Sequence, residues 1–212
     1  MKSFVDGYIK KMPIMRVAIA LIFFCPLCLE AGQRIPSPAA AIANLTDPSK
    51  LSTLKGERAA NPRLFKCVYY IATAKEQGQD PKVVLAEAAK LNGTSGTPYA
   101  GFIEWGLIEN LRIAKSYGVL DSVGMEQMRR GKAPTITKGA FIGQEAEADH
   151  VIPRAVCPEL RNQVLNLELL AASENRAKSD KIGQRQVTFA KELYDARLLS
   201  EEGWKSIQNK KM

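Results

Sequence analysis

The middle of the chain carries apolar residues at the spacing of amphipathic helices. An Asn-Pro pair at residues 61–62 and an Asp-Pro pair at 80–81 each combine a helix-capping side chain with a proline suited to the first helical position. Apolar residues then recur at intervals of three and four, the period of a helix packed on one face. The pattern predicts helices beginning at Asn61, as an N-cap, and at Asp80, followed by helices over about residues 99–117 and 121–130.

The period of the apolar positions changes after Pro134. Residues 135–139 and 145–152 alternate or run apolar around glycines, which is typical of short strands, and residues 165–170 show the same pattern. Ser173 is suited to cap a helix that continues to Lys181. The predicted order is strand, loop, strand and helix, with two further helices, one ending near residue 199 and one beginning at Ser200.

The first part of the chain has the layout of a secretory leader. Residues 1–16 are basic, and the 13-residue apolar run from Val17 to Leu29 is shorter than the ~20 residues of a membrane-spanning helix. We expect cleavage near Ala31 and export to the periplasm or the medium; an uncleaved leader that anchors the protein in a membrane is the alternative.

The rest of the chain divides by composition and period. A stretch rich in Pro, Ser and Ala follows the leader and shows no sustained period, which favours a flexible tether. The predicted organisation is a signal peptide over 1–31, the tether over 32–55, a helical region over 56–131 and a second domain over 132–212.

Charge and histidine content narrow the classes of function. The chain carries a formal net charge of +8, which suits a polyanion such as nucleic acid, although membrane-surface proteins are also basic. His150 is the only histidine, so a zinc site with two histidine ligands is excluded.

The number of cysteines in the mature chain, and whether they are oxidised, depends on export. Cleavage near Ala31 would remove Cys25 and Cys28 and leave Cys67 and Cys157. In an oxidising compartment this even number permits a disulfide, and two separate buried thiols are the alternative.

The predicted strands and the helix that follows them carry a set of polar side chains in a recognisable order. The segments D-H-V-I-P, N-L-E-L-L and E-N-R-A-K-S-D-K place Asp149, His150, Asn166, Asn175 and Lys178 on strand, strand and helix. Over about residues 134–185 this order resembles the HNH family of ββα-metal endonucleases, small exported bacterial proteins among them. The resemblance implies an α+β fold: a mainly helical N-terminal region packed on a small ββα-metal core with C-terminal helices.

The chemistry of these residue types is suited to phosphodiester hydrolysis. A neutral imidazole at His150, with an ordinary pKa of about 6.5, can take a proton from water. Asp149 and Asn175 offer hard oxygen ligands for one divalent cation, Mg²⁺ or Mn²⁺. The resemblance further implies that Asn166 holds the loop and orients the base, and that Lys178 projects toward phosphate.

Two details bear on this site. Successive strand residues point to opposite faces, so Asp149 and His150 can serve one site only where the strand ends. The position of the last histidine in the family name is Asn175 here, which weakens the case for zinc or nickel, since both favour imidazole.

We therefore expect a metal-dependent HNH-type endonuclease of weak sequence specificity, with DNA favoured over RNA as substrate. A catalytically inactive ββα module that binds nucleic acid or protein is the alternative, and an unrelated helical protein in which the motif is coincidental is another. The sequence does not identify a protein inhibitor or partner. Basic residues near the motif are candidate phosphate contacts or solvated charges: Arg154, Arg161, Arg176 and Lys181.

Overall fold

The computed structural model describes residues 36–210. The predicted leader, its cleavage site and the beginning of the predicted tether lie outside the described residues. Within the described range no helix is both long and apolar enough to cross a membrane.

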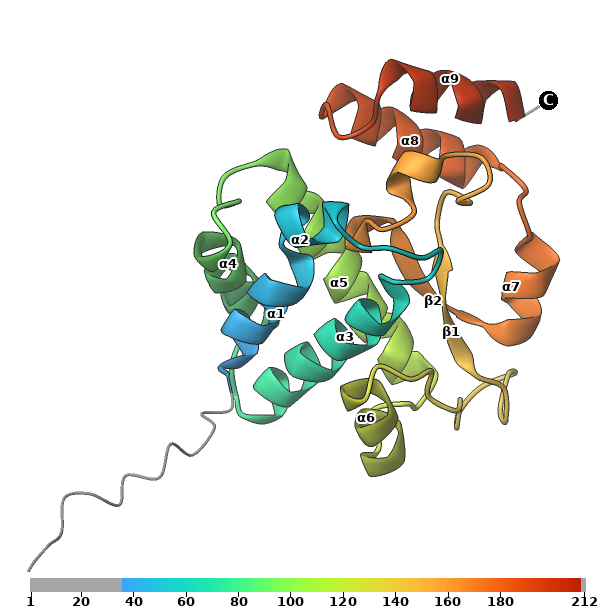
Figure 1. Cartoon of the computed structure of the whole chain (residues 1–212). Coiled ribbons are helices and arrows are strands. Elements are labelled where there is room, and N and C mark those ends of the chain that lie inside the picture. The colour runs from blue at the N-terminus through green and yellow to red at the C-terminus, as the bar shows by residue number, and fades with distance from the viewer. Residues whose placement is uncertain (1–35, 211–212) are drawn as a thin grey trace, which may run out of the picture. The chain divides into compact units, whose positions relative to one another are not determined.

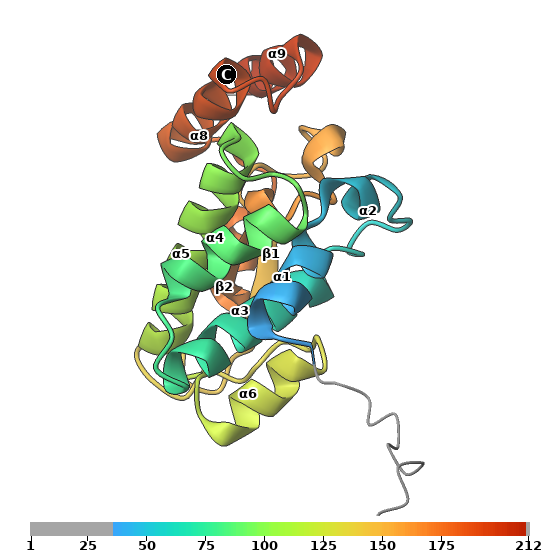
Figure 2. The same cartoon turned by 90° about the vertical axis from the view of Figure 1, so that its left-hand side faces the viewer.

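The N-terminal half of the described chain is helical (Figures 1 and 2). Capping side chains followed by proline begin most of these helices, as the sequence pattern predicts at Asp80. The helices are α1 (Pro38–Thr46), α2 (Pro48–Ser52), α3 (Asn61–Glu76), α4 (Pro81–Leu91), α5 (Pro98–Ser116) and α6 (Ser122–Arg129).

The prediction of a flexible tether over residues 32–55 is wrong for residues 38–52, which form α1 and α2. The side chains of Ser37 and Asp47 cap these helices, and each is followed by proline. Ile42 and Leu51 are fully buried, so this segment contributes to the core. The alanine-rich composition that suggests a linker is here a helix-forming composition.

Asn61 differs from its predicted role as an N-cap. Ala60 occupies the cap position, and Asn61 is the first residue of α3. The Asn61 side chain instead donates a hydrogen bond of 2.8 Å from Nδ2 to the carbonyl oxygen of Ala148. It thereby links the helical region to the strand that carries the motif.

The C-terminal half contains the strand, loop, strand and helix order. Strand β1 (Ala146–His150) pairs antiparallel with β2 (Leu167–Ala171), with His150 opposite Leu167, and helix α7 (Ala172–Lys178) follows directly. The loop between the strands holds two single turns of 3₁₀ helix, Pro158–Leu160 and Val164–Asn166. Helices α8 (Gln184–Asp195) and α9 (Glu201–Lys210) complete the described chain.

The strand predicted over 135–139 is wrong, because only an isolated bridge between Thr135 and Glu145 forms there. Ser173 is also not the cap of the following helix: Ala171 takes that position without a capping side chain.

The hairpin lies between two sets of helices (Figure 1). Helices α3 and α5 pack on one side of it and α7 on the other. Asn110 of α5 joins the first set to β2: its Nδ2 donates to the Leu167 carbonyl oxygen at 3.0 Å, and its Oδ1 accepts from the Leu169 amide at 2.7 Å. These bonds satisfy backbone groups at an open strand edge. The fold is thus mainly helical α+β, with an antiparallel hairpin followed by C-terminal helices, as expected from the sequence.

Cys67 and Cys157 are both free and buried. The structure therefore has two separate thiols rather than the hypothesised disulfide. Burial raises the pKa of Cys67 to about 12 and the pKa of Cys157 to about 11, so both thiols stay protonated at neutral pH.

Candidate active site at the end of the hairpin

Three of the five motif side chains line one small hollow. Asp149, His150 and Asn175 border a space of about 260 Å³ at the end of β1. The other two are not among the lining residues: Lys178 donates to Asp149 Oδ2 and to the His150 carbonyl oxygen, and Asn166 bonds to Ile152, two residues after His150. The two strands and α7 thus bring the whole motif together.

The alternation of β1 divides its side chains between two faces. Glu147 and Asp149 contact residues of α7, whereas Ala146, Ala148 and His150 belong to the buried set of the strand. His150 is the last residue of β1, and both it and Asp149 line the hollow despite their opposite faces. This matches the expectation that the pair lies where the strand ends.

The hydrogen bond of His150 defines which nitrogen carries the proton. Its Nε2 lies 2.7 Å from the backbone carbonyl oxygen of Arg161, and the side chain is buried at 6% exposure. A carbonyl oxygen only accepts, so Nε2 is the N–H and, in the neutral ring, Nδ1 is a free base. Burial lowers the pKa of His150 below its usual 6.5, which favours the neutral ring.

Asn166 closes the loop between the strands. It lies in the 3₁₀ turn before β2, rather than on the strand as predicted, and is fully buried. Its Oδ1 accepts from the Ile152 amide at 2.9 Å, and its Nδ2 donates to the Ile152 and Leu160 carbonyl oxygens at 3.0 and 3.4 Å. This is the loop-holding arrangement that the family resemblance implies.

Lys178 is directed into the site rather than toward solvent. Its ammonium group donates to Asp149 Oδ2 and to the His150 carbonyl oxygen, and lies 3.9 Å from Glu168 Oε1. Glu168 pairs with Asp149 across the hairpin and also binds Arg185 through contacts of 3.1 and 2.5 Å. Lys178 thus pairs with Asp149 and lies near a second carboxylate, that of Glu168, a position different from the predicted contact with phosphate.

Asn175 is held by a residue that the sequence interpretation missed. Its Nδ2 donates a 2.6 Å hydrogen bond to Oε2 of Glu147, which lines the same hollow. The signal was present in the segment E-A-E-A-D at residues 145–149, because residues two apart on a strand share a face. The motif itself does not include Glu147, so only this alternation points to it.

The oxygen atoms at the hollow are suited as ligands for a hard cation. In the described part of the chain no hydrogen bond engages Asp149 Oδ1 or Asn175 Oδ1, and Asn61 Oδ1 is buried with no partner. The described residues contain no cluster of three His, Cys, Asp or Glu placed to hold a metal. A site with few protein ligands, all of them oxygens, suits Mg²⁺ or Mn²⁺ better than zinc. Mg²⁺ and Mn²⁺ keep water and substrate oxygens in their coordination shell.

The predicted phosphate contacts differ in their surroundings. Arg154 lines the hollow and forms an ion pair with Glu57. The side chains of Arg161 and Arg176 are exposed, and the backbone carbonyl oxygen of Arg161 accepts the hydrogen bond from His150. Lys181 donates to the Ala177 carbonyl oxygen at 3.0 Å.

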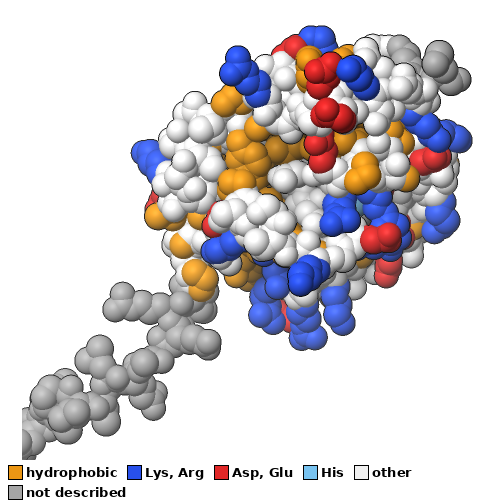
Figure 3. All heavy atoms as spheres, turned by 45° about the horizontal axis from the view of Figure 1, so that its top comes forward, with side chains coloured by type: hydrophobic (Ala, Val, Ile, Leu, Met, Phe, Trp, Pro, Cys, Tyr) orange, Lys and Arg blue, Asp and Glu red, His pale blue; other side chains and the backbone are white. Residues whose placement is uncertain are grey.

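Arg58, which also lines the hollow, was missed because it belongs to the helical region. The molecular surface carries further positive charge: Figure 3 shows Lys and Arg side chains gathered along the lower edge of one face.

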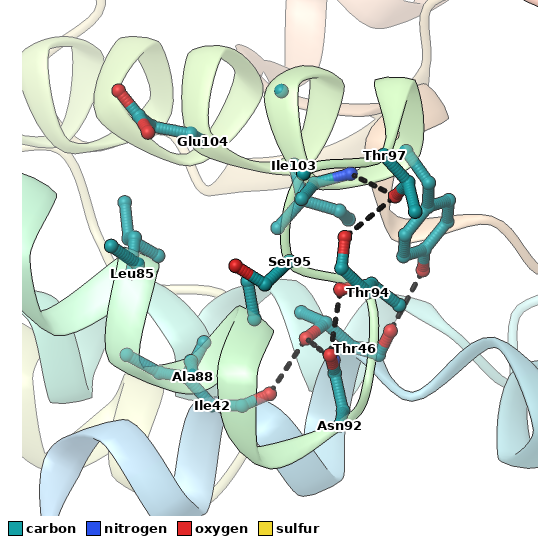
Figure 4. A pocket seen from close by; sticks show the side chains of 16 residues that line it. Ile42, Thr46, Leu85, Ala88, Asn92, Thr94, Ser95, Thr97, Ile103 and Glu104 are labelled. Carbon is teal, nitrogen blue, oxygen red and sulfur yellow. Dashed lines mark hydrogen bonds between the residues drawn. The ribbon is translucent and has the colours of Figure 1, made fainter.

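A second hollow of about 340 Å³ lies among α1, α4 and α5 (Figure 4). Its polar groups are already bonded to one another: Tyr99 donates to the Thr46 carbonyl oxygen at 2.7 Å, and Thr94 donates to Asn92 Oδ1 at 2.7 Å. Asn92 in turn donates to Thr46 Oγ1 at 3.3 Å. These bonds satisfy the polar groups of Tyr99, Thr94 and Asn92 within the hollow.

Comparison with protein-family models, with curated proteins and with solved structures found no match to this chain. The functional argument therefore rests on the site.

Proposed function

We propose that this protein is a metal-dependent endonuclease that hydrolyses phosphodiester bonds with His150 as general base, DNA being its main substrate. The observation that carries the proposal is the bond from His150 Nε2 to the Arg161 carbonyl oxygen, which leaves Nδ1 unprotonated in a neutral ring that lines a polar hollow. A base fixed in one tautomer beside oxygen ligands for a cation is what water activation at phosphorus requires.

The proposed reaction begins with a water molecule near His150. Nδ1 takes a proton from the water as its oxygen attacks phosphorus, and the bond from phosphorus to one bridging oxygen breaks. The leaving oxygen takes up a proton from a solvent water molecule and becomes a hydroxyl, the other product is a phosphate monoester, and His150 later returns its proton to solvent. The imidazolium that forms keeps its bond to Arg161 and lies beside the negative charge of Asp149, which favours the protonated ring.

Asp149 and Asn175 would hold one Mg²⁺ or Mn²⁺ ion through their uncommitted oxygens. The bound ion would supply positive charge to the phosphate and the leaving oxygen. Arg58 and Arg154 would contact the flanking phosphates; the support for this is that both line the hollow.

One observation favours the second candidate, an inactive module that binds nucleic acid. Lys178 contacts Asp149 Oδ2 and so competes for one of the two carboxylate oxygens. Such a module would retain DNA without cutting it.

Incubation of the purified protein with supercoiled plasmid tests the proposal. With Mg²⁺ we expect nicked and linear products, and with a chelator we expect none. Binding of plasmid without cleavage at any Mg²⁺ or Mn²⁺ concentration would favour the inactive module. A parallel assay on single-stranded RNA tests the preference for DNA.

We also propose that the protein is exported, on the grounds of the basic and apolar segments that precede the described residues. Intact-mass measurement of material from the periplasm or the medium should give a chain beginning near Gly32. Full-length protein found only in the cytosol would contradict export.

A further inference from the structure

We infer that Glu147 is a positioning residue that fixes the side-chain amide of Asn175 so that its oxygen, and not its nitrogen, is available to a divalent cation. This inference rests on the proposed function, because it assigns a role toward the metal site that the function requires.

The argument begins with the symmetry of an amide. The oxygen and nitrogen of an Asn side chain exchange places when the amide turns by half a rotation, and only the oxygen can ligate a hard cation. A site that uses Asn as a ligand therefore needs a group that distinguishes the two orientations.

Glu147 is such a group. Its carboxylate accepts from Asn175 Nδ2 at 2.6 Å, a short bond of the charge-assisted kind. The reversed amide would place oxygen against oxygen at this contact, which is repulsive. Within the described residues no other side chain bonds to the Asn175 amide, so its orientation depends on Glu147.

The strand geometry keeps Glu147 in this place. Glu147 and Asp149 share one face of β1, and α7 lies across that face, since Lys178 of α7 contacts Asp149 while Asn175 contacts Glu147. Asn175, a proposed metal ligand on α7, is thus held by a hydrogen-bond partner on β1. Partners of this kind typically change metal affinity about 10–100-fold when removed.

The test measures Mn²⁺ affinity of the full chain by electron paramagnetic resonance, in which bound Mn²⁺ loses the signal of the free ion. Glu147→Ala should weaken Mn²⁺ binding by about 10–100-fold. Glu147→Gln should bind within a few-fold of wild type, because its amide oxygen still accepts from Asn175. Glu145→Ala is the matched control: it removes an equal charge from the same hollow and should change affinity little.

The decisive comparison uses Asn175→Asp as a background. A carboxylate offers an oxygen in either orientation, so Glu147→Ala should weaken Mn²⁺ binding there no more than the charge control Glu145→Ala does. The effect of Glu147→Ala should therefore fall from about 10–100-fold to the size of the charge control in the Asn175→Asp background.

Several results would overturn the inference. If Glu147→Gln weakens binding as much as Glu147→Ala, then Glu147 is itself a ligand. If Glu147→Ala behaves like Glu145→Ala, or if the wild type binds no Mn²⁺, Glu147 has no positioning role. Thermal unfolding in the presence of chelator shows whether each variant is folded. If Glu147→Ala does not fold, Glu147→Leu takes its place, because leucine keeps the side-chain bulk without a hydrogen-bond acceptor.

The proposed function can fail while this inference holds. In that case Mn²⁺ binding by the variants follows the expected pattern, but the wild type does not cleave plasmid.

Discussion

The imidazole Nε2 of His150 lies 2.7 Å from the backbone carbonyl oxygen of Arg161, a residue of the loop that joins the two strands. Burial of the ring disfavours its charged form and lowers its pKa, with the carbonyl and Asp149 opposing this in part. We expect proton NMR titration of the untagged, metal-free protein to give a pKa below 6.5. The signal is unambiguous because the chain has one histidine.

The direction of this shift has a consequence for stability. The unfolded chain binds a proton near pH 6.5 and the folded chain only at lower pH, so stability is present above that value and falls as pH decreases through the folded pKa. A pKa at or above 6.5 would contradict the buried, neutral ring.

Replacement of Asn166 should destabilise the fold. Asn166→Ala removes the partners of the Ile152 amide and carbonyl, both in the buried loop, and should lower the free energy of unfolding by about 3 kcal/mol. Urea denaturation measures this. Asn44→Ala, at an exposed position, is the control and should change stability by no more than about 0.5 kcal/mol. Equal stability of the two variants would show that Asn166 does not hold the loop.

Lys178 competes with a cation for Asp149, so its removal should have opposite effects on stability and metal binding. Lys178→Ala leaves Asp149 unpaired, and we expect the metal-free protein to lose about 3 kcal/mol of stability. Mn²⁺ should bind more tightly and restore part of that loss.

Thermal unfolding with and without Mn²⁺ measures both effects of Lys178→Ala. Lys181→Ala is the matched control, since Lys181 is exposed and its ammonium contacts only a backbone carbonyl. Weaker Mn²⁺ binding by Lys178→Ala than by Lys181→Ala would show that Lys178 supports the metal site instead of competing for it.

Both buried cysteines should resist alkylation in the native protein. Burial raises the pKa of Cys67 to about 12 and of Cys157 to about 11, and thiolate is the reactive form. We expect iodoacetamide to label Cys67 and Cys157 only after denaturation without reductant, as read by peptide mass spectrometry. If the peptides that contain Cys67 and Cys157 are labelled only after reduction, the two residues form a disulfide and this prediction is wrong.

The sequence predicted the parts of the fold that have strong local signals. The Asp-Pro pair at Asp80, the apolar period of α5 and the strand–loop–strand–helix order all appear in the structure. Ser37 and Asp47 carry the same capping signal and begin α1 and α2, but the prediction of a tether followed the alanine- and proline-rich composition alone. Local pattern could not show that these short helices have a surface to pack on.

The site was predictable only where the motif is contiguous or regularly spaced. The motif positions from Asp149 to Lys178 meet as expected, but the roles of partners from elsewhere depend on tertiary contacts. Arg58 and Asn61 reach the hollow from a segment about 90 residues earlier. The inward direction of Lys178 follows from its hydrogen bonds to Asp149 and to the His150 carbonyl oxygen on β1, which helix spacing alone does not reveal.

The rate of plasmid cleavage by His150→Ala under single-turnover conditions, at saturating Mg²⁺ and neutral pH, tests the central claim most directly. A positioned general base contributes about 10²–10⁴-fold to the rate, and His150 makes no charged contact with phosphate in this account. We expect cleavage to fall by that factor while plasmid binding, measured by gel shift, stays close to wild type. A variant that keeps more than about a tenth of the wild-type rate would contradict the assignment of His150 as the base.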